Sequence, residues 1–366
     1  MSIPLHFHDE DWARIERDHA AWWAHELDRP LVQVIGKEYD RKITYPQVYD
    51  FVSNYPFNVS VDEIVADLSL HLSATRFYGD AHPRWWVNFG PGIMAGFLGA
   101  RVHSVRETVW FDPPDLLPAS DIHFSYQPDN PWWRRVVDLT RQAVQAWGRQ
   151  VQVSHTDLGG NLDILASFRT TEQLLYDVIE RPEEVERLVR QITQCWVKYY
   201  DELHALLAAA GRGTTPWAPI WSPGRCYMLQ CDFSYMISPK MFERFVLPDL
   251  EACCENLDHG FYHLDGKGQL PHLDMLLSMR RLRGVQWIPG SGQPSADRWP
   301  EVLARIKRAG RLCQIFVSPA EALRVVREHG GKGFALAVGA GDMTPGQIQD
   351  FLKTLAEEDK DKPRRH

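Results

Sequence analysis

The amino-acid sequence predicts an α/β protein, a single-domain (β/α)8 TIM barrel with an N-terminal helical extension. Eight short apolar segments are separated by segments in which apolar residues recur at helical spacing, most regularly in the second half of the chain. Polar clusters follow many of these apolar segments, as they do at the carboxyl ends of barrel strands. The competing fold, a doubly wound open sheet, is disfavoured because no Gly-x-Gly-x-x-Gly sequence follows the first apolar segment.

The N-terminal part of the chain alternates helices and strands. Its first helix has acidic residues in the opening turn, and Ser60 with Glu63 forms a capping box before the second. The predicted elements are helices at 9–27, at 61–74 and up to Ala100, strands at 31–35 and 84–88, and an irregular Pro- and Asp-rich excursion over 102–130.

The middle of the chain contains the third and fourth predicted strands. Residues 156–163 are too polar and glycine-rich to lie inside a helix or strand. Pro182 and Pro239 each stand at the first position of a predicted helix, where a missing backbone N–H costs little. The predicted elements are strands at 151–155 and 215–221, and helices at 131–148, 171–179, 182–210 and 238–256.

The C-terminal part has the most regular alternation. The fifth to eighth strands are predicted at 261–264, 284–288, 312–317 and 333–338, with helices at 269–278, 295–309, 319–329 and 345–357. The charged tail is expected to be disordered. The resulting domain prediction is a helical extension at 1–30, one barrel domain at 31–357 and a disordered tail at 358–366.

Composition excludes several classes of function. The 366 residues are 44% hydrophobic and 24% charged, with a net charge of −8, which is typical of a soluble globular protein and disfavours nucleic acid as a partner. No stretch approaches the roughly 18 apolar residues of a membrane span, so no membrane partner is expected. The six cysteines form no Cys-x-x-Cys pair, and the N-terminus lacks a signal-peptide core, which favours a reducing, cytoplasmic location without disulfides.

Two His-x-Asp pairs at strand ends are the candidate catalytic residues. His263 and Asp265 follow the fifth strand, and His155 and Asp157 follow the third. Alternate residues of an extended strand share a face, so each pair can act together in proton transfer. Simpler roles remain open: Asp265 could cap the next helix, the backbone could satisfy His263, and Asp157 could form a turn.

The same residue types can bind a metal or a substrate. Imidazole plus carboxylate suits zinc or another divalent metal, so His263 and Asp265 are candidate ligands. Cys226 and Cys231, expected on the loop after the fourth strand, could contribute or be inert. The candidate substrate-binding residues are polar or aromatic side chains expected near strand ends or on that loop, namely Asn88, Asn161, Trp221, Tyr227, Asp232 and Trp287. The glycine-rich pieces match no nucleotide-binding pattern.

Four segments of the chain resemble the uroporphyrinogen decarboxylase superfamily, which includes methyltransferases linked to corrinoids and folate. The most specific is Ile-Ser-Pro-x-Met-Phe-x-x-Phe-Val-Leu-Pro within 232–248, and the others are 90–100, 160–167 and 263–266. The resemblance covers about residues 30–357 and implies a (β/α)8 barrel with the site at its C-terminal mouth.

Departures from the superfamily patterns fall on the chemistry. Porphyrinogen decarboxylases carry Arg-Gln-Ala-Gly-Arg, where this chain has Trp-Trp-Ala-His-Glu-Leu-Asp-Arg-Pro at 22–30, and they carry Gly-His-Gly where 339–341 is Gly-Ala-Gly. The zinc-dependent thiol methyltransferases use His-x-Cys and a later Cys, where this chain has His263, Asp265 and Ala340. The resemblance therefore implies a site without zinc-thiolate ligands.

The leading functional hypothesis is methyl transfer linked to a corrinoid protein or folate. Decarboxylation of a uroporphyrinogen-like or other small carboxylated substrate is the alternative, and a non-catalytic binding barrel is the third. The expected partners are a small-molecule substrate and a corrinoid protein, with the chain as a monomer or homodimer. The cofactor is left open between a divalent metal such as zinc, a corrinoid and folate.

Overall fold

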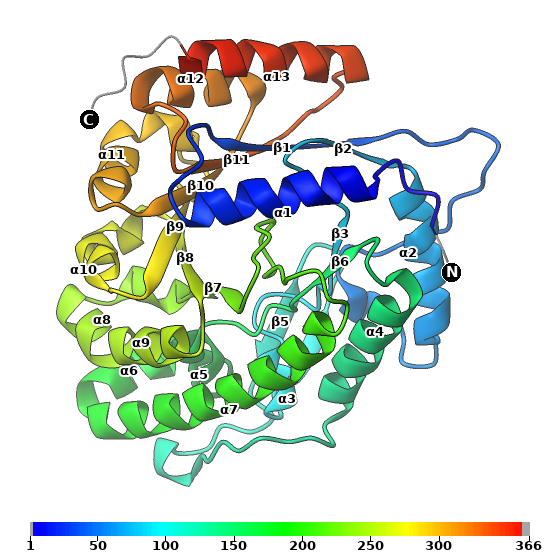
Figure 1. The fold of residues 1–366 in the computed structure, drawn as a ribbon. Coiled ribbons are helices and arrows are strands. Elements are labelled where there is room, and N and C mark those ends of the chain that lie inside the picture. The colour runs from blue at the N-terminus through cyan, green and yellow to red at the C-terminus, as the bar shows by residue number, and fades with distance from the viewer. Residues whose placement is uncertain (1–2, 361–366) are drawn as a thin grey trace.

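A mostly parallel seven-stranded sheet lies at the centre of the computed structural model, which describes residues 3–360 (Figure 1). The strand order is β2-β1-β11-β10-β9-β8-β7, and only β2 runs antiparallel to its neighbour. The strands are β1 (Leu31–Lys37), β2 (Thr75–Gly79), β7 (Cys226–Gln230), β8 (His259–Asp265), β9 (Leu282–Ile288), β10 (Leu312–Val317) and β11 (Phe334–Val338). The predicted α/β class is confirmed.

Two smaller ladders stand beside this sheet. β3 (Arg84–Trp86) pairs in parallel with β6 (Gln152–Ser154), and β4 (Arg101–Ser104) pairs antiparallel with β5 (Val109–Asp112). Within residues 3–360 no ladder joins β6 to β7 or β1 to β3. Strand pairing therefore leaves two seams and does not by itself show the closed barrel predicted from the sequence.

The predicted helices are present, with local differences. They are α1 (Asp9–Trp23), α2 (Val61–Ser73), α3 (Met94–Phe97), α4 (Pro131–Trp147), α5 (Asn161–Arg169), α6 (Thr171–Glu180), α7 (Pro182–Ala208), α8 (Pro239–Phe245), α9 (Leu247–Glu255), α10 (Leu273–Ser278), α11 (Pro300–Arg308), α12 (Pro319–His329) and α13 (Pro345–Lys360). The single helix predicted at 238–256 divides at Val246, where Pro248 follows. Helix α5 was not expected, because its first turn lies in the polar segment 156–163.

The disordered tail predicted at 358–366 is wrong for its first three residues, which continue α13. Glu358 pairs with Arg327, and the carboxylate of Asp359 accepts a hydrogen bond from the backbone N–H of Gly331 at 2.7 Å. These contacts hold the last turn of the helix against α12 and the segment after it. Residues 361–366 lie outside the described part of the chain.

The prediction of a fourth strand at 215–221 is wrong. This segment has no ladder of its own and instead contacts several strands through its carbonyl groups. The oxygen of Thr215 accepts from the backbone N–H of His155 at 3.0 Å, and that of Pro219 accepts from Nε2 of Gln33 at 2.6 Å. The strand at this point of the chain is β7, so Cys226 and Tyr227 lie in a strand and not on a loop.

The sheet has an inner face that changes character along the strands. We call inner the face that carries Leu31, Met228, Phe261, Leu312 and Ala335, all of them buried and apolar. Trp22 and Trp23 of α1 pack on this amino-terminal half, together with Ala218 and Ile220. Further along the same face come the polar side chains Gln33, Gln230, His263, Gln286 and Gln314. The polar residues thus lie toward the carboxyl ends of the strands.

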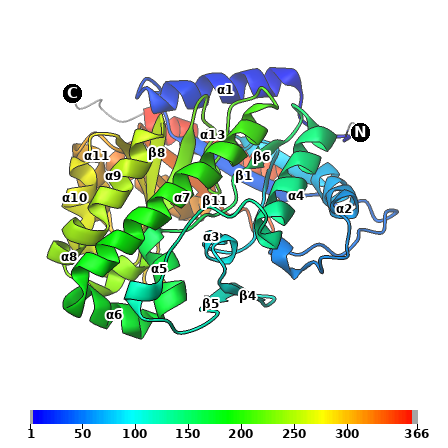
Figure 2. The ribbon, with the colours of Figure 1, turned by 90° about the horizontal axis from the view of Figure 1, so that it is seen from below.

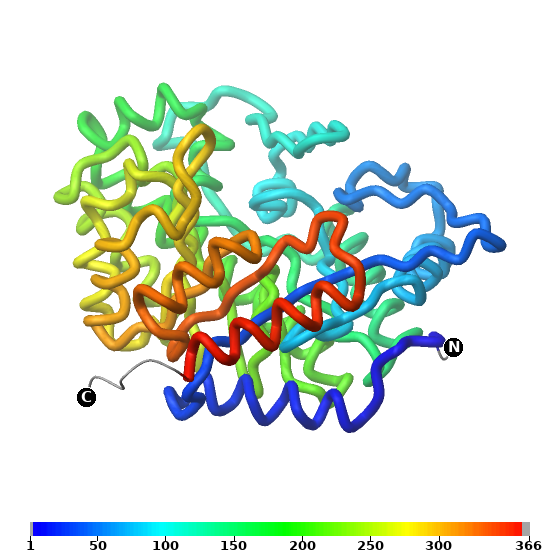
Figure 3. The backbone as a smooth tube through the Cα atoms, turned by 90° about the horizontal axis from the view of Figure 1, so that it is seen from above, coloured from blue at the N-terminus to red at the C-terminus, as the bar shows by residue number. Residues whose placement is uncertain are grey.

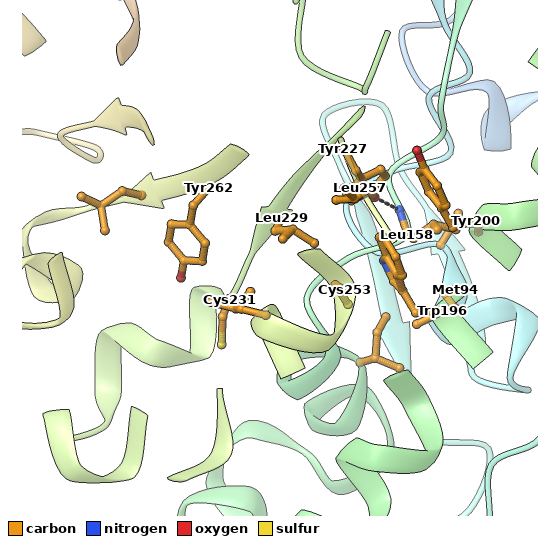
Figure 4. Packing of buried hydrophobic residues seen from close by; sticks show 14 of the residues in the cluster. Met94, Leu158, Trp196, Tyr200, Tyr227, Leu229, Cys231, Cys253, Leu257 and Tyr262 are labelled. Atoms are coloured by element: carbon orange, nitrogen blue, oxygen red, sulfur yellow. Dashed lines mark hydrogen bonds between the residues drawn. The ribbon is translucent and has the colours of Figure 1, made fainter. Parts of the chain in front are cut away.

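The outer face of the sheet packs against the helices. Tyr227 and Leu229 of β7 lie among buried side chains of helices α7 and α9 (Figure 4). The ring of Tyr227 stands edge-on to Trp196 of α7, with 5.1 Å between centroids. Helix α1 lies on one side of the molecule, whereas α3 and the β4–β5 hairpin lie on the opposite side (Figures 2 and 3).

All six cysteines are buried and free, in agreement with the absence of a disulfide framework. No helix between residues 3 and 360 has the length and apolar character to cross a membrane.

Candidate functional site

Three side chains at the carboxyl ends of β7 and β8 converge on one point. His263 and Asp265 lie two residues apart on β8 and so share the inner face, and Nε2 of His263 is 3.7 Å from Oδ2 of Asp265. Asp232 begins the 3₁₀ helix η3 (Asp232–Met236), directly after β7. One ligand atom from each of the three lies within 4.8 Å of the others. The structure therefore brings the predicted His263–Asp265 pair together and adds Asp232 to it.

A row of side chains on the inner face orients His263. Gln286 of β9 stands directly opposite His263, and Gln314 of β10 stands opposite Gln286. Nδ1 of His263 hydrogen-bonds Oε1 of Gln286, while Nε2 of Gln286 donates to Oε1 of Gln314. Because a carboxamide oxygen only accepts, Nδ1 carries the proton in this arrangement. In the neutral ring Nε2 is then the basic atom, and it faces the two carboxylates.

Nearby charges favour the protonated form of His263. Burial by itself would lower the pKa of His263, but the nearby carboxylates of Asp265 and Asp232 and the hydrogen bond with Gln286 outweigh it. The net result is a pKa raised above the ordinary value. Part of Asp232 is exposed, yet the surrounding protein desolvates its carboxylate enough to raise its pKa.

Two more carboxyl groups approach this point from the segment after β6. Burial raises the pKa of Asp157 to about 7, against the opposing effects of the Gly159 N–H and His263. Asp163 accepts backbone N–H bonds from Asp232 and Phe233 at 2.9 and 2.7 Å, and burial, followed by the charge of Asp232, raises its pKa to about 8. We call Asp157, Asp163, Asp232, Asp265 and His263 together the acidic cluster.

Gly160 permits the close approach of this segment to β7. A side chain at Gly160 would collide with the carbonyl oxygen of Gln230 and with the carboxylate of Asp163. A residue without a Cβ is therefore required at this position, which brings α5 and its Asp163 to the end of β7.

A cavity of about 500 Å³ lies beside Trp217, which contacts His263, and no residue of the acidic cluster itself lines this cavity. Its lining comes mainly from β1, β3, β10, β11 and residues 217–219, and includes Gln33, Ile35, Arg84, Trp86, Trp217 and Phe316. The Trp217 ring separates this cavity from His263, standing edge-on to the imidazole with 5.2 Å between centroids. Ile35 and Phe316 are 46% and 50% exposed, so the cavity opens to solvent between apolar walls.

His155, the histidine of the other predicted pair, lies outside the acidic cluster. Its ring stacks on Tyr200 of α7 with 4.7 Å between centroids. Burial, together with the charges of His204 and Arg225, holds its pKa well below the ordinary value. The structure therefore separates His155 from Asp157, because His155 points to the helix layer while Asp157 joins the acidic cluster.

Of the six predicted substrate-binding residues, Asp232 belongs to the acidic cluster, and Tyr227 lies close enough to Asp157 for that charge to add to burial in raising the Tyr227 pKa. The other four lie away from the acidic cluster. Tyr227 on the outer face of β7 accepts a hydrogen bond from the Leu158 N–H at 2.7 Å. Trp221 packs with Trp12 under α1, and Trp287 is fully buried on the outer face of β9. These three side chains are part of the packed core.

The two asparagines make structural hydrogen bonds. Asn161 bonds the Thr193 hydroxyl at 3.0 Å and the carboxylate of Asp249, joining α5 to α7 and α9. Asn88 donates to the carbonyl oxygen of Asp50 at 3.0 Å and accepts from the Gly90 N–H at 3.1 Å. Both residues position loops and helices around the site without reaching the acidic cluster.

Sequence reasoning missed Asp163, Gln286, Gln314, Trp217 and Arg84. A glutamine inside a predicted strand interrupts the apolar run, but the sequence does not indicate that its side chain contributes to a site. Asp163 follows a glycine pair, which indicated a turn. Trp217 and Arg84 gain importance only because residues 215–221 pass across the inner face.

The acidic cluster fits a divalent cation better than a soft metal. One imidazole and two carboxylates converge, which suits zinc, manganese or a similar ion. Cys226 belongs to the apolar half of the inner face, and burial, with the charge of Asp163, holds the pKa of the Cys231 thiol well above its usual range. The ligand set found among residues 3–360 contains no cysteine.

Comparisons with known proteins show a likeness of fold. No protein-family model and no curated protein matches the sequence. Among solved structures, a methyltransferase from Methanosarcina mazei is similar, with a TM-score of 0.50 and 14% identity. The similarity covers 76% of this chain and 80% of that chain. At this identity the likeness concerns the fold, and it agrees with the α/β architecture described above.

Proposed function

We propose that this protein is an enzyme that transfers a methyl group to a small molecule bound beside the acidic cluster. The convergence of Asp232, His263 and Asp265 at the carboxyl ends of parallel strands, with an open cavity across Trp217 from His263, carries this proposal. The fold-level likeness to a methyltransferase gives it a direction. The resemblance of the sequence motifs to the uroporphyrinogen decarboxylase superfamily points the same way.

Asp232, His263 and Asp265 would hold a divalent metal. When bound, the ion would act as a Lewis acid that makes the acceptor atom of the substrate easier to deprotonate. Trp217 and Trp86 would hold the body of the substrate and exclude water from it.

Proton balance assigns a role to a carboxylate near His263. An acceptor with an X–H bond loses its proton as it gains the methyl group, and the donor leaves without the methyl. Asp157, with a pKa of about 7, can take that proton at neutral pH. Gln286 would keep Nε2 of His263 directed at the cluster throughout.

A methyl donor carried by a corrinoid protein, or a methyl folate, is the proposed second reactant. Four exposed apolar side chains offer a surface on which a flat methyl donor could lie. Ile35 and Phe316 line the cavity, and Tyr235 and Met236 lie on η3 beside Asp232. Such a surface favours contact with a large planar group.

We further propose that eight parallel strands, β1, β3 and β6 to β11, form a barrel-like domain over 31–357, with 1–30 as its extension. Residues 215–221 would fill the seams, since their carbonyls contact β1 and the end of β6. Arg84 of β3 also donates to the carbonyl oxygen of Trp217, at 3.1 and 3.2 Å.

Decarboxylation of a small carboxylated substrate is the second candidate. Loss of CO₂ leaves a carbanion that must gain a proton, and a carboxyl group with a pKa of about 7 can supply it. Release of CO₂ without consumption of a methyl donor would favour this alternative over methyl transfer.

Metal content and methyl transfer test the proposal together. We expect purified protein to bind one equivalent of zinc or manganese, and His263→Ala, Asp232→Asn and Asp265→Asn each to weaken that binding. The matched control is His103→Ala, because His103 and Asp112 form an exposed pair at 3.2 Å on the β4–β5 hairpin. The enzyme should demethylate methylcobalamin or methyltetrahydrofolate in the presence of an acceptor. Protein that binds no metal and consumes neither donor would refute the proposal.

A further inference from the structure

Arg84 is a cation at the wall of the cavity without an acidic partner. It lies on β3, is partly buried and lines the cavity. Its guanidinium donates to the carbonyl oxygen of Trp217 and to Oγ of Ser154 at 3.5 Å. These three hydrogen bonds leave two of the five N–H donors of the guanidinium unused.

Other buried arginines of the chain pair with carboxylates. Arg169 contacts Asp177 at 2.6 Å, and Arg212 contacts Glu16 at 3.1 Å and Asp9 at 3.3 Å. Among residues 3–360, no carboxylate lies within ion-pair distance of Arg84. Burial alone lowers the pKa of Arg84, to about 10, which still leaves it charged at neutral pH.

A buried charge without a counter-ion is costly, so such charges are normally paired. Resting on the proposed function of the neighbouring cluster, we propose that Arg84 binds the carboxylate of a monoanionic substrate with an apolar body. The carboxylate would accept the unused N–H groups of Arg84, and the apolar body would lie between Trp86, Trp217 and Phe316.

The charge and lining of the cavity select this class of ligand. Arg84 is the only Lys or Arg among the residues that line the cavity. It can neutralise one negative charge of a ligand, whereas a phosphate dianion or a polycarboxylate would keep at least one unpaired negative charge. Oε1 of Gln33 is buried without a hydrogen-bond partner and lies on the same lining.

This binding mode would also set the direction of the substrate. Trp217 lies between the two sites, with its carbonyl oxygen on Arg84 and its ring against His263. A substrate whose carboxylate binds Arg84 would extend past Trp217, so the reactive group at its other end would lie near the acidic cluster.

Binding of benzoate and its neutral isostere benzamide tests the proposal. Isothermal titration calorimetry of the wild-type protein should show benzoate binding at least about tenfold more tightly than benzamide, because charge-assisted hydrogen bonds are made only by the carboxylate. Acetate, a smaller monocarboxylate, should compete with benzoate, and inorganic phosphate should compete less well.

Variants of Arg84 separate charge from structure. Arg84→Gln should abolish the preference for benzoate over benzamide, whereas Arg84→Lys should retain part of it, since an ammonium supplies charge without the planar fork. Arg141→Gln, which removes an exposed arginine on α4, should leave the preference unchanged. Circular dichroism would confirm that each variant is folded. If Arg84→Gln does not fold, the preference of Arg84→Lys for benzoate over benzamide provides the test.

The outcomes distinguish this proposal from the function of the acidic cluster. Equal affinity of the wild-type protein for the two probes, no binding of benzoate, or a preference that survives in Arg84→Gln would each overturn the role of Arg84. None of these results depends on metal binding by His263. Conversely, benzoate selectivity in a protein that binds no metal would retain the Arg84 site while removing the proposed metal-dependent transfer.

Discussion

His263 and Gln286 stand opposite each other on the paired strands β8 and β9, and Nδ1 of His263 is hydrogen-bonded to Oε1 of Gln286. The partner of Gln286 on its other side is Gln314, so the carboxamide is held at both ends. This relationship determines which ring nitrogen of His263 faces Asp232 and Asp265. Parallel pairing in register is what aligns the three side chains.

Replacing Gln286 with Leu should weaken metal binding without removing a ligand. Loss of the bond to Nδ1 frees the imidazole to rotate, and changes of this kind typically cost about 10–100-fold in metal affinity. Zinc titration against a competing chelator would measure the effect. Gln152→Leu is the control, because Gln152 is a buried glutamine of β6 that bonds the carbonyl oxygen of Gly213. Unchanged affinity in Gln286→Leu would show that this hydrogen bond does not position the ligand.

Replacing Asp265 with Cys should shift the metal preference of the cluster toward zinc. A thiolate is a softer ligand than a carboxylate, and zinc prefers it more strongly than manganese does. Competition between the two ions, measured by metal analysis after dialysis, would report the shift. Asp112→Cys, beside His103 on the exposed hairpin, is the matched control. An Asp265→Cys variant that keeps the wild-type preference would place Asp265 outside the ligand set.

Replacing Asp157 with Asn should stabilise the metal-free protein, and more so at high pH. The folded-state pKa of Asp157 is raised to about 7 from an ordinary value of 3.8, so the unfolded state releases its proton at lower pH than the folded state does. The free energy of unfolding therefore falls as pH rises through this window. Asn removes the titration while its Oδ1 can still accept the Gly159 N–H.

Urea unfolding in EDTA at pH 5 and pH 8 would measure this effect. The stability difference between Asp157→Asn and wild type should grow by about 2–3 kcal/mol over that range, from roughly 1.4 kcal/mol for each pH unit up to the folded-state pKa. Asp138→Asn, at an exposed position on α4, controls for the loss of one charge. A pH-independent difference would contradict the raised pKa of Asp157.

Replacing Trp23 with Ala should destabilise the fold by about 3–5 kcal/mol, the usual cost of removing a large buried aromatic side chain. Trp23 stacks on His259 with 4.3 Å between centroids and donates from Nε1 to the Trp221 carbonyl oxygen at 2.9 Å. Chemical denaturation would measure the loss. Trp110→Ala is the control, because Trp110 is 64% exposed and its removal leaves no buried cavity. Equal effects of the two substitutions would mean that α1 does not hold the ends of the strands.

Local sequence patterns were sufficient to predict most helices and strands. Helix α12 begins and ends where the helical spacing predicts it, and Ser318 with Glu321 forms a capping box at its start. The strands β8 to β11 are short apolar runs between helices, and periodicity identifies such runs well. The pairing of His263 with Asp265 was also predictable, since alternate residues of a strand share a face.

The strand expected at 215–221 shows where local patterns fail. Thr215, Trp217 and Ile220 have the composition of a strand, but the carbonyl oxygens of Thr215 and Trp217 accept hydrogen bonds from His155 and Arg84, which are distant in the chain. Composition reports that a segment is buried and cannot report whether its carbonyls meet a neighbouring strand or an arginine side chain. For the same reason His155 and Asp157, two residues apart, were expected together and lie in different surroundings.

The sequence by itself thus determined the alternation of elements, the acidic balance and the His263–Asp265 pair, because these depend on residues close together in the chain. Only the tertiary structure decided that Asp232 and Asp157 join that pair, that Gln286 orients the imidazole and that Arg84 lacks a carboxylate. These relationships depend on strand register and on contacts between segments that lie tens to more than a hundred residues apart. Their energies arise from burial and from charge–charge distance, and neither quantity exists until the chain has folded.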